Sequence, residues 1–133
     1  MTLPIKNKYQ NLKILIVEDD ELSFLYIKII LKSITKNFVR VKTGEEAIHY
    51  LELHPVDVLL LDVNLPDVSG LEIAGVVFEK YPHLGIILNS AFSLEDDRED
   101  VMQNNNFQYL SKPLQKEKML VALDKIFGTV EHS

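Results

Sequence analysis

Four short stretches of this sequence carry side chains that could do chemistry together, and each directly follows an apolar run. The first is the acidic triplet Glu18-Asp19-Asp20, and the second begins at Asp62. Ser90 and Lys112 follow the other two runs. Carboxylates brought together repel one another and favour a divalent cation, while a hydroxyl and an ammonium group can bind phosphoryl oxygens. These residue types indicate metal-assisted phosphoryl chemistry.

The candidate metal ligands are all oxygen atoms. The sequence contains no cysteine, and its four histidines share no spacing, so we expect them on the surface rather than at a metal or phosphotransfer site. Oxygen ligands suit Mg²⁺ or Mn²⁺ rather than zinc. A carboxylate beside such an ion can accept a phosphoryl group as a nucleophile. With Lys112 as the cation and Ser90 as the hydroxyl, the set is complete for phosphorylation of an aspartate.

Five short runs of apolar residues predict the strands that must position these groups. The predicted strands span residues 13–17, 38–41, 56–61, 84–88 and 107–110. Helical periodicity separates them. After the first strand, the residues predicted to face the core are Leu22, Leu25, Tyr26, Ile29 and Ile30.

Capping signals mark where the later helices begin and end. Thr43 with Glu46 and Ser69 with Glu72 form capping-box patterns, and Ser93 with Asp96 forms a third N-terminal signal. The last helix is predicted over residues 115–127, before Gly128 as its C-cap.

This alternation of strands and helices predicts an α/β fold with a doubly wound, five-stranded parallel sheet. A closed eight-stranded barrel needs about 250 residues, whereas this chain has 133. Ligands of open parallel sheets bind beyond the carboxyl ends of the strands. We therefore expect all four chemical stretches at one edge of the sheet.

Composition and charge narrow the possible functions. The hydrophobic fraction of 47% and charged fraction of 26% are typical of a folded domain. A net charge of −6 disfavours binding to nucleic acid or to anionic membranes. The N-terminus lacks an apolar signal core, so we expect a cytoplasmic protein. We divide the chain into a leader or linker (1–11), one domain (12–128) and a tail (129–133).

Four motifs in this order resemble the receiver domain of two-component response regulators, over about residues 12–128. The motifs are Ile14-Leu-Ile-Val-Glu18-Asp19-Asp20, Leu59-Leu-Leu-Asp62-Val-Asn64-Leu-Pro66, Asn89-Ser90-Ala91-Phe92 and Tyr109-Leu-Ser-Lys112-Pro113. The resemblance implies a flavodoxin-like (βα)5 fold with strand order 2-1-3-4-5. It also implies phosphorylation by a histidine kinase or a histidine phosphotransfer protein.

The same resemblance implies roles at the metal site. Asp62 is the expected phosphoacceptor and also a metal ligand. Asp19 matches the direct Mg²⁺ ligand, and Glu18 the carboxylate that reaches the metal through water. The backbone carbonyl of Asn64 matches the third protein ligand.

Four further residues match the parts of the family that bind the phosphoryl group and respond to it. Lys112 matches the lysine that pairs with the phosphate, and Ser90 the switch hydroxyl. Tyr109 matches the aromatic residue that swings inward, and Pro113 the proline that follows a cis peptide bond. We also expect residues 94–109 and the last helix to change on phosphorylation.

The predicted activity is that of a phosphorylated switch with slow self-hydrolysis rather than that of an enzyme. One alternative is an interaction module that no longer uses phosphate; another is a phosphatase of the haloacid dehalogenase class. The acidic triplet also has a plainer interpretation as an N-cap cluster, above all at Asp20. Residues 18–26, and residues 90–93 with 97–99, are similar to C-terminal receivers of hybrid sensor histidine kinases, in which residues 1–11 would be the linker.

Overall fold

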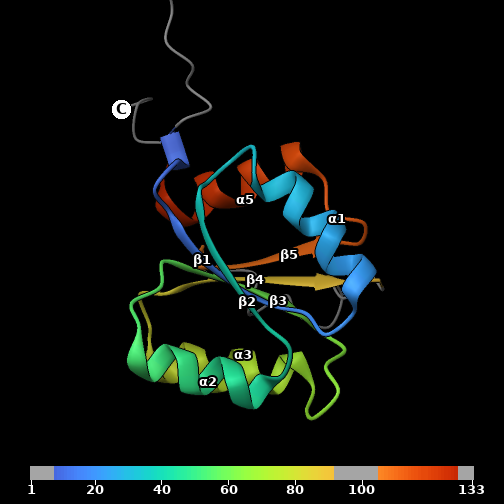
Figure 1. Ribbon diagram of the computed structural model, residues 1–133. Coiled ribbons are helices and arrows are strands. Elements are labelled where there is room, and N and C mark those ends of the chain that lie inside the picture. The colour runs from blue at the N-terminus through green and yellow to red at the C-terminus, as the bar shows by residue number, and fades with distance from the viewer. Residues whose placement is uncertain (1–7, 92–104, 129–133) are drawn as a thin grey trace, which may run out of the picture.

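The computed structural model describes residues 8–91 and 105–128 (Figure 1). Its centre is a five-stranded parallel sheet with strand order β2-β1-β3-β4-β5. The strands are β1 Lys13–Val17, β2 Asn37–Val41, β3 Val58–Asp62, β4 Gly85–Ser90 and β5 Phe107–Ser111. The predicted fold class and strand order are confirmed.

Helices cover both faces of the sheet. Those within the described ranges are α1 Glu21–Leu31, α2 Gly44–Leu53, α3 Gly70–Lys80 and α5 Lys116–Phe127. Helices α1 and α5 lie on one face, and α2 and α3 on the other (Figure 1). None of these helices is both long and apolar enough to cross a membrane. The helix predicted after Ser93 lies outside the described residues.

The two faces of each inner strand feed two separate apolar layers. In β1, Ile14 and Ile16 pack toward α1 and α5, whereas Leu15 and Val17 pack toward α2 and α3. Strands β3 and β4 are buried along their whole length, as expected for strands covered on both sides. The faces of the sheet are therefore apolar and buried, and polar functional groups can lie together at its carboxyl edge.

Local capping fixes where the helices start. The Asp20 carboxylate accepts a hydrogen bond from the Ser23 amide at 2.8 Å and caps α1. Thr43 and Glu46 form the predicted capping box of α2, and Ser69 caps α3 through the Leu71 amide. Gly128 ends α5 with a positive φ of 79°, a backbone conformation that glycine adopts without strain.

The predicted core face of α1 is wrong at four of its five residues; the fifth, Ile30, is partly buried against the core. Leu22, Leu25, Tyr26 and Ile29 are 77%, 50%, 45% and 69% exposed, whereas the buried residues of α1 are Ile27 and Leu31. The reason is that α1 is apolar nearly all round, with the sequence ELSFLYIKIIL. Its periodicity fits two stripes equally well, and the stripe running through Ile27 and Leu31 is the one that faces the sheet.

Residues 8–11, which we assigned to the leader, belong to the folded domain. Tyr9 is 8% exposed and packs in the layer under α1 and α5. Its hydroxyl donates to the Asp124 carboxylate of α5, and burial together with this carboxylate raises the pKa of Tyr9 to about 12. The carbonyl of Gln10 accepts from the Lys36 amide at 3.0 Å. The sequence feature that could have indicated this is Tyr9, a large aromatic residue that directly follows Lys8.

Candidate functional site

Three carboxylates meet at the carboxyl edge of the sheet, where β1 and β3 lie side by side. Oxygen atoms of Glu18, Asp19 and Asp62 all lie within 4.8 Å of one another. Glu18 and Asp62 are 1% and 4% exposed, and Asp19 is exposed. The strand order reverses between β1 and β3, which is the point where open α/β sheets bind ligands. The structure thus brings together the acidic groups that the sequence placed there.

Lys112 reaches the same carboxylate cluster from beyond β5. Its Nζ atom lies 3.1 Å from Asp62 Oδ1 and 3.7 Å from Glu18 Oε1. The Lys112 amide donates to the Ser90 carbonyl at 2.8 Å, and the Lys112–Pro113 peptide bond is cis. The lysine side chain is 25% exposed, so its charge acts on the buried carboxylates with little screening by water.

Ser90 lies on β4, the strand next to β3, and Tyr109 lies on β5, the strand beyond it. Ser90 is the last residue of β4, is 2% exposed and directly follows Asn89, the residue paired with Asp62. Tyr109 is half-buried in β5, and its ring centroid lies 6.4 Å from that of Phe107. Ser90 therefore lies at the carboxyl edge, as the sequence predicted, and Tyr109 lies in the middle of β5. Their roles as switch residues remain proposals.

The loop after Asp62 folds back tightly on the strand. The Asn64 amide donates to Asp62 Oδ1 at 3.2 Å, and the Gly70 amide donates to the Val63 carbonyl at 2.7 Å. A Cβ atom on Gly70 would lie 2.2 Å from the carbonyl oxygen of Asp62. Only glycine fits there, so Gly70 is a residue of the site that our sequence reasoning missed.

Asp67 ties this loop to the neighbouring helix. Its carboxylate accepts hydrogen bonds from the Gly44 amide at 3.0 Å and the Glu45 amide at 3.1 Å, at the start of α2. The Gly44 amide is the main reason why the pKa of Asp67 is lowered. Nothing in the local pattern pointed to Asp67, because its partners lie more than twenty residues earlier in the chain.

Burial disfavours the charged form of the Glu18 carboxyl. Desolvation, assisted by the nearby Asp62 charge, raises the pKa of Glu18 to about 7, against the opposing effects of the Asp20 amide and of Lys112. One oxygen, Oε2, accepts from the Asp20 amide at 3.1 Å. The other, Oε1, is buried without a hydrogen-bond partner.

These groups fit a hard divalent cation. A buried carboxylate oxygen without a hydrogen-bond donor, beside two further carboxylates, offers ligands and negative charge that Lys112 only partly balances. Mg²⁺ and Mn²⁺ accept such oxygen ligands and keep some of their water. Glu18, Asp19 and Asp62 are the groups that would hold the ion, and a contribution from the carbonyl of Asn64 stays a prediction.

The fold and this pocket define a class: flavodoxin-like α/β proteins whose carboxylates and lysine converge at the switch point of the sheet. The family model described as the response regulator receiver domain matches residues 14–124. This chain therefore belongs to the response regulator receiver domain family.

Curated relatives and solved structures agree with this assignment. The chain is 29% identical to the polar-differentiation response regulator DivK of Brucella ovis over 117 residues, covering 86% of this chain and 95% of DivK. DivK of Brucella anthropi is 28% identical over the same length and coverage. These relatives are themselves response regulators of receiver length.

Two solved structures illustrate the similarity of fold. A receiver domain protein from Clostridium thermocellum matches with a TM-score of 0.76 at 22% identity, over 92% of this chain and 98% of that one. The response regulator TrrA from Thermotoga maritima, solved in complex with Mg²⁺ and BeF, matches with a TM-score of 0.73 at 24% identity, over 87% and 99%. At these identities the likeness establishes the fold.

Proposed function

We propose that this domain accepts a phosphoryl group on Asp62, with Mg²⁺ bound, and then presents a changed surface to a protein partner. The donor is a histidine kinase or a histidine phosphotransfer protein. The observation that carries the proposal is the placement of Lys112 Nζ 3.1 Å from Asp62 Oδ1, inside a cluster of three carboxylates. Family membership and the Mg²⁺–BeF complex of the similar TrrA support it.

Each residue of the pocket has a part in the transfer. An oxygen of Asp62 attacks phosphorus as the bond from phosphorus to the donor histidine nitrogen breaks. Bound Mg²⁺ would neutralise charge on the carboxylates and on the phosphoryl oxygens. Lys112 and the Ser90 hydroxyl bind the other phosphoryl oxygens, while the Asn64 amide holds Asp62 Oδ1 in place. Slow hydrolysis by water returns the domain to its starting state.

Two alternatives have less support. A phosphate-independent interaction module would have no need of Lys112 beside Asp62, yet the pair is intact. A phosphatase of the haloacid dehalogenase class places its nucleophile after the first strand in an Asp-x-Asp pair. Here Asp62 ends β3 and is followed by Asn64 two positions later.

Intact mass spectrometry with acetyl phosphate as donor tests the proposal. The wild-type domain should gain one phosphoryl group only when Mg²⁺ is present, and Asp62→Asn should gain none. The conservative Asp67→Asn variant serves as a control for the loss of a nearby carboxylate and should still be labelled. Labelling of Asp62→Asn to the wild-type level would refute the assignment of the phosphoacceptor.

The exposed face of α1 is the surface on which we place the donor protein. Leu22, Leu25, Tyr26 and Ile29 project from it. A groove of about 360 Å³ runs from Leu22 and Tyr26 to Lys112 and Pro113. The groove thus links this apolar face to Lys112, whose Nζ lies 3.1 Å from Asp62 Oδ1, so a helical donor seated there could bring a phosphohistidine to Asp62.

Polar substitutions on this face should slow phosphoryl transfer from a protein donor but not from the small molecule acetyl phosphate. We expect Leu22→Ser with Ile29→Ser to slow transfer from a phosphorylated histidine phosphotransfer protein by at least about tenfold, because apolar anchors dominate such interfaces. Labelling by acetyl phosphate should not change. Leu53→Ser on α2, where Leu53 is 63% exposed, is the matched control. An equal loss with Leu53→Ser, or none with the α1 variant, would count against this surface.

Several finer expectations remain predictions. They are the similarity to C-terminal receivers of hybrid histidine kinases, the cytoplasmic location, the domain boundary at residue 128 and the response of residues 94–109 to phosphorylation. Residues 94–104 lie outside the described part of the chain. Hydrogen exchange of residues 105–127, measured with and without BeF, would address the described portion of the responding surface.

A further inference from the structure

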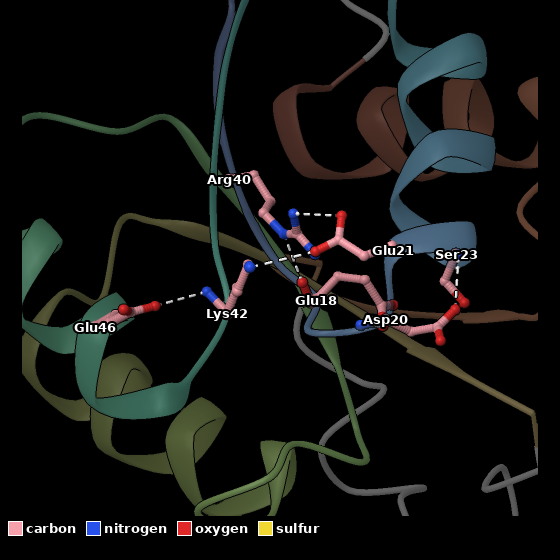
Figure 2. A network of polar contacts seen from close by, with 7 residues as sticks. All are labelled: Glu18, Asp20, Glu21, Ser23, Arg40, Lys42 and Glu46. Carbon is pink, nitrogen blue, oxygen red and sulfur yellow. Dashed lines mark hydrogen bonds and ion pairs between the residues drawn. The ribbon is translucent and has the colours of Figure 1, made fainter.

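Arg40 on the edge strand β2 reaches across to the loop that carries the acidic triplet. Its Nε atom donates to the Glu18 carbonyl at 2.7 Å, and its Nη1 atom donates to Glu21 Oε1 at 3.3 Å (Figure 2). The side chain is only 13% exposed. The Glu18 amide in turn donates to the Val41 carbonyl of β2 at 3.1 Å. Strand β2 therefore holds both peptide groups of Glu18, one through its backbone and one through Arg40.

The guanidinium group is fixed on its face as well as on its edges. Its central carbon lies 4.5 Å from the ring centroid of Phe24 in α1. Glu21 is also an α1 residue, and Arg40 is the first cause of its lowered pKa. Arg40 thus joins β2, the β1–α1 loop and the first turns of α1. These contacts fix the orientation of its planar guanidinium group.

We propose that Arg40 is a positioning residue for the divalent cation, holding the Glu18 carbonyl so that the carboxylates of Glu18 and Asp19 face Asp62. The inference rests on the proposed function, because it concerns the same cation site. Arg40 does not itself contact the pocket. It acts through the backbone of Glu18, whose Oε2 is held by the Asp20 amide on the other side. Outer groups of this kind typically contribute 10–100-fold to metal affinity.

The sign of the effect distinguishes positioning from simple electrostatics. Arg40 is a cation, and a cation near the site repels Mg²⁺. If charge alone mattered, removing it would tighten binding. If Arg40 positions the loop, removing it weakens binding despite the loss of repulsion. Lys42 offers a matched comparison, because its Nζ lies 3.2 Å from the other oxygen of Glu21, yet its side chain is 56% exposed (Figure 2).

Calorimetric titration of the full chain with MgCl2 tests the proposal. We expect about tenfold weaker binding for both Arg40→Gln and Arg40→Lys, and no weakening for Lys42→Gln. Affinity per folded molecule is the readout, with the folded fraction taken from urea unfolding of each metal-free variant. A loss of stability alone would leave this affinity unchanged, and Arg40→Lys keeps the charge should Arg40→Gln fold poorly.

The possible outcomes separate the two proposals. Unchanged or tighter binding in both Arg40 variants overturns the positioning role, while the wild-type affinity still supports the proposed function. Wild-type affinity in Arg40→Lys also overturns it, because the ammonium cannot reproduce the fixed fork of the guanidinium. A wild-type chain that does not bind Mg²⁺ overturns the proposed function, and this inference with it.

Discussion

Replacing Lys112 with methionine should slow phosphorylation of Asp62 by acetyl phosphate at least about 100-fold while leaving Mg²⁺ binding as tight or tighter. The rate falls because the ammonium group, 3.1 Å from Asp62 Oδ1, is no longer there to stabilise charge on the transferred group, and single donors of this kind are worth 10²–10³-fold. Binding of Mg²⁺ does not weaken, because the competing cation has gone and the carboxylate ligands remain.

The same substitution should lower the stability of the metal-free domain by about 2 kcal/mol, because it leaves two buried carboxylates without their partner. Urea unfolding in EDTA measures this, and intact mass over time measures the labelling rate. Lys118→Met on the exposed side of α5 is the control and should behave as wild type. Loss of Mg²⁺ binding in Lys112→Met would show that the lysine orders the metal ligands rather than balancing their charge.

Glu18→Gln should stabilise the metal-free domain by about 2 kcal/mol at about pH 8 while weakening Mg²⁺ binding about tenfold. Burial raises the pKa of Glu18 to about 7, above its ordinary value of 4.5. The folded state therefore favours the protonated carboxyl. The stability that the protonated Glu18 carboxyl contributes to the folded state is fully present below about pH 4.5 and is lost as pH rises through about 7. An amide in its place avoids the penalty of a buried charge.

Unfolding free energies at about pH 5 and about pH 8, in EDTA, check the sign of this effect. The gain from Glu18→Gln should be larger at the higher pH, and the exposed Glu79→Gln on α3 should show no such difference. A variant less stable than wild type at both pH values would mean that the carboxylate stabilises the pocket. We thus expect Glu18→Gln to gain stability and to lose Mg²⁺ affinity, because wild type keeps a destabilising buried charge that serves metal binding.

Sequence patterns predicted the sheet and most of the pocket because both depend on short-range rules. Apolar runs identified the strands, and parallel strands place their carboxyl ends at one edge. Asp62 and Lys112 could thus be brought together although one ends β3 and the other follows β5. The helix caps Asp20, Thr43 and Gly128 could be predicted for the same reason, because a cap forms its hydrogen bonds within one turn of its helix.

The parts that escaped prediction depend on which partner a side chain meets across the fold. Helix α1 is apolar on more than one side, so periodicity could not tell the stripe through Ile27 from the exposed stripe through Leu22. Arg40 and Asp67 bind backbone groups more than twenty residues away. Contacts of that kind leave no mark in local spacing, and they are the ones that orient the loops of the site.

Locating the phosphoryl group within the chain would show whether Asp62 is the phosphoacceptor. The domain would be treated with acetyl phosphate with and without Mg²⁺, reduced with borohydride to convert an aspartyl phosphate to homoserine, digested and sequenced by mass spectrometry. We expect homoserine at position 62 alone, and only in the sample with Mg²⁺. Homoserine at Asp19 or Asp20, or labelling at position 62 that does not depend on Mg²⁺, would contradict this expectation.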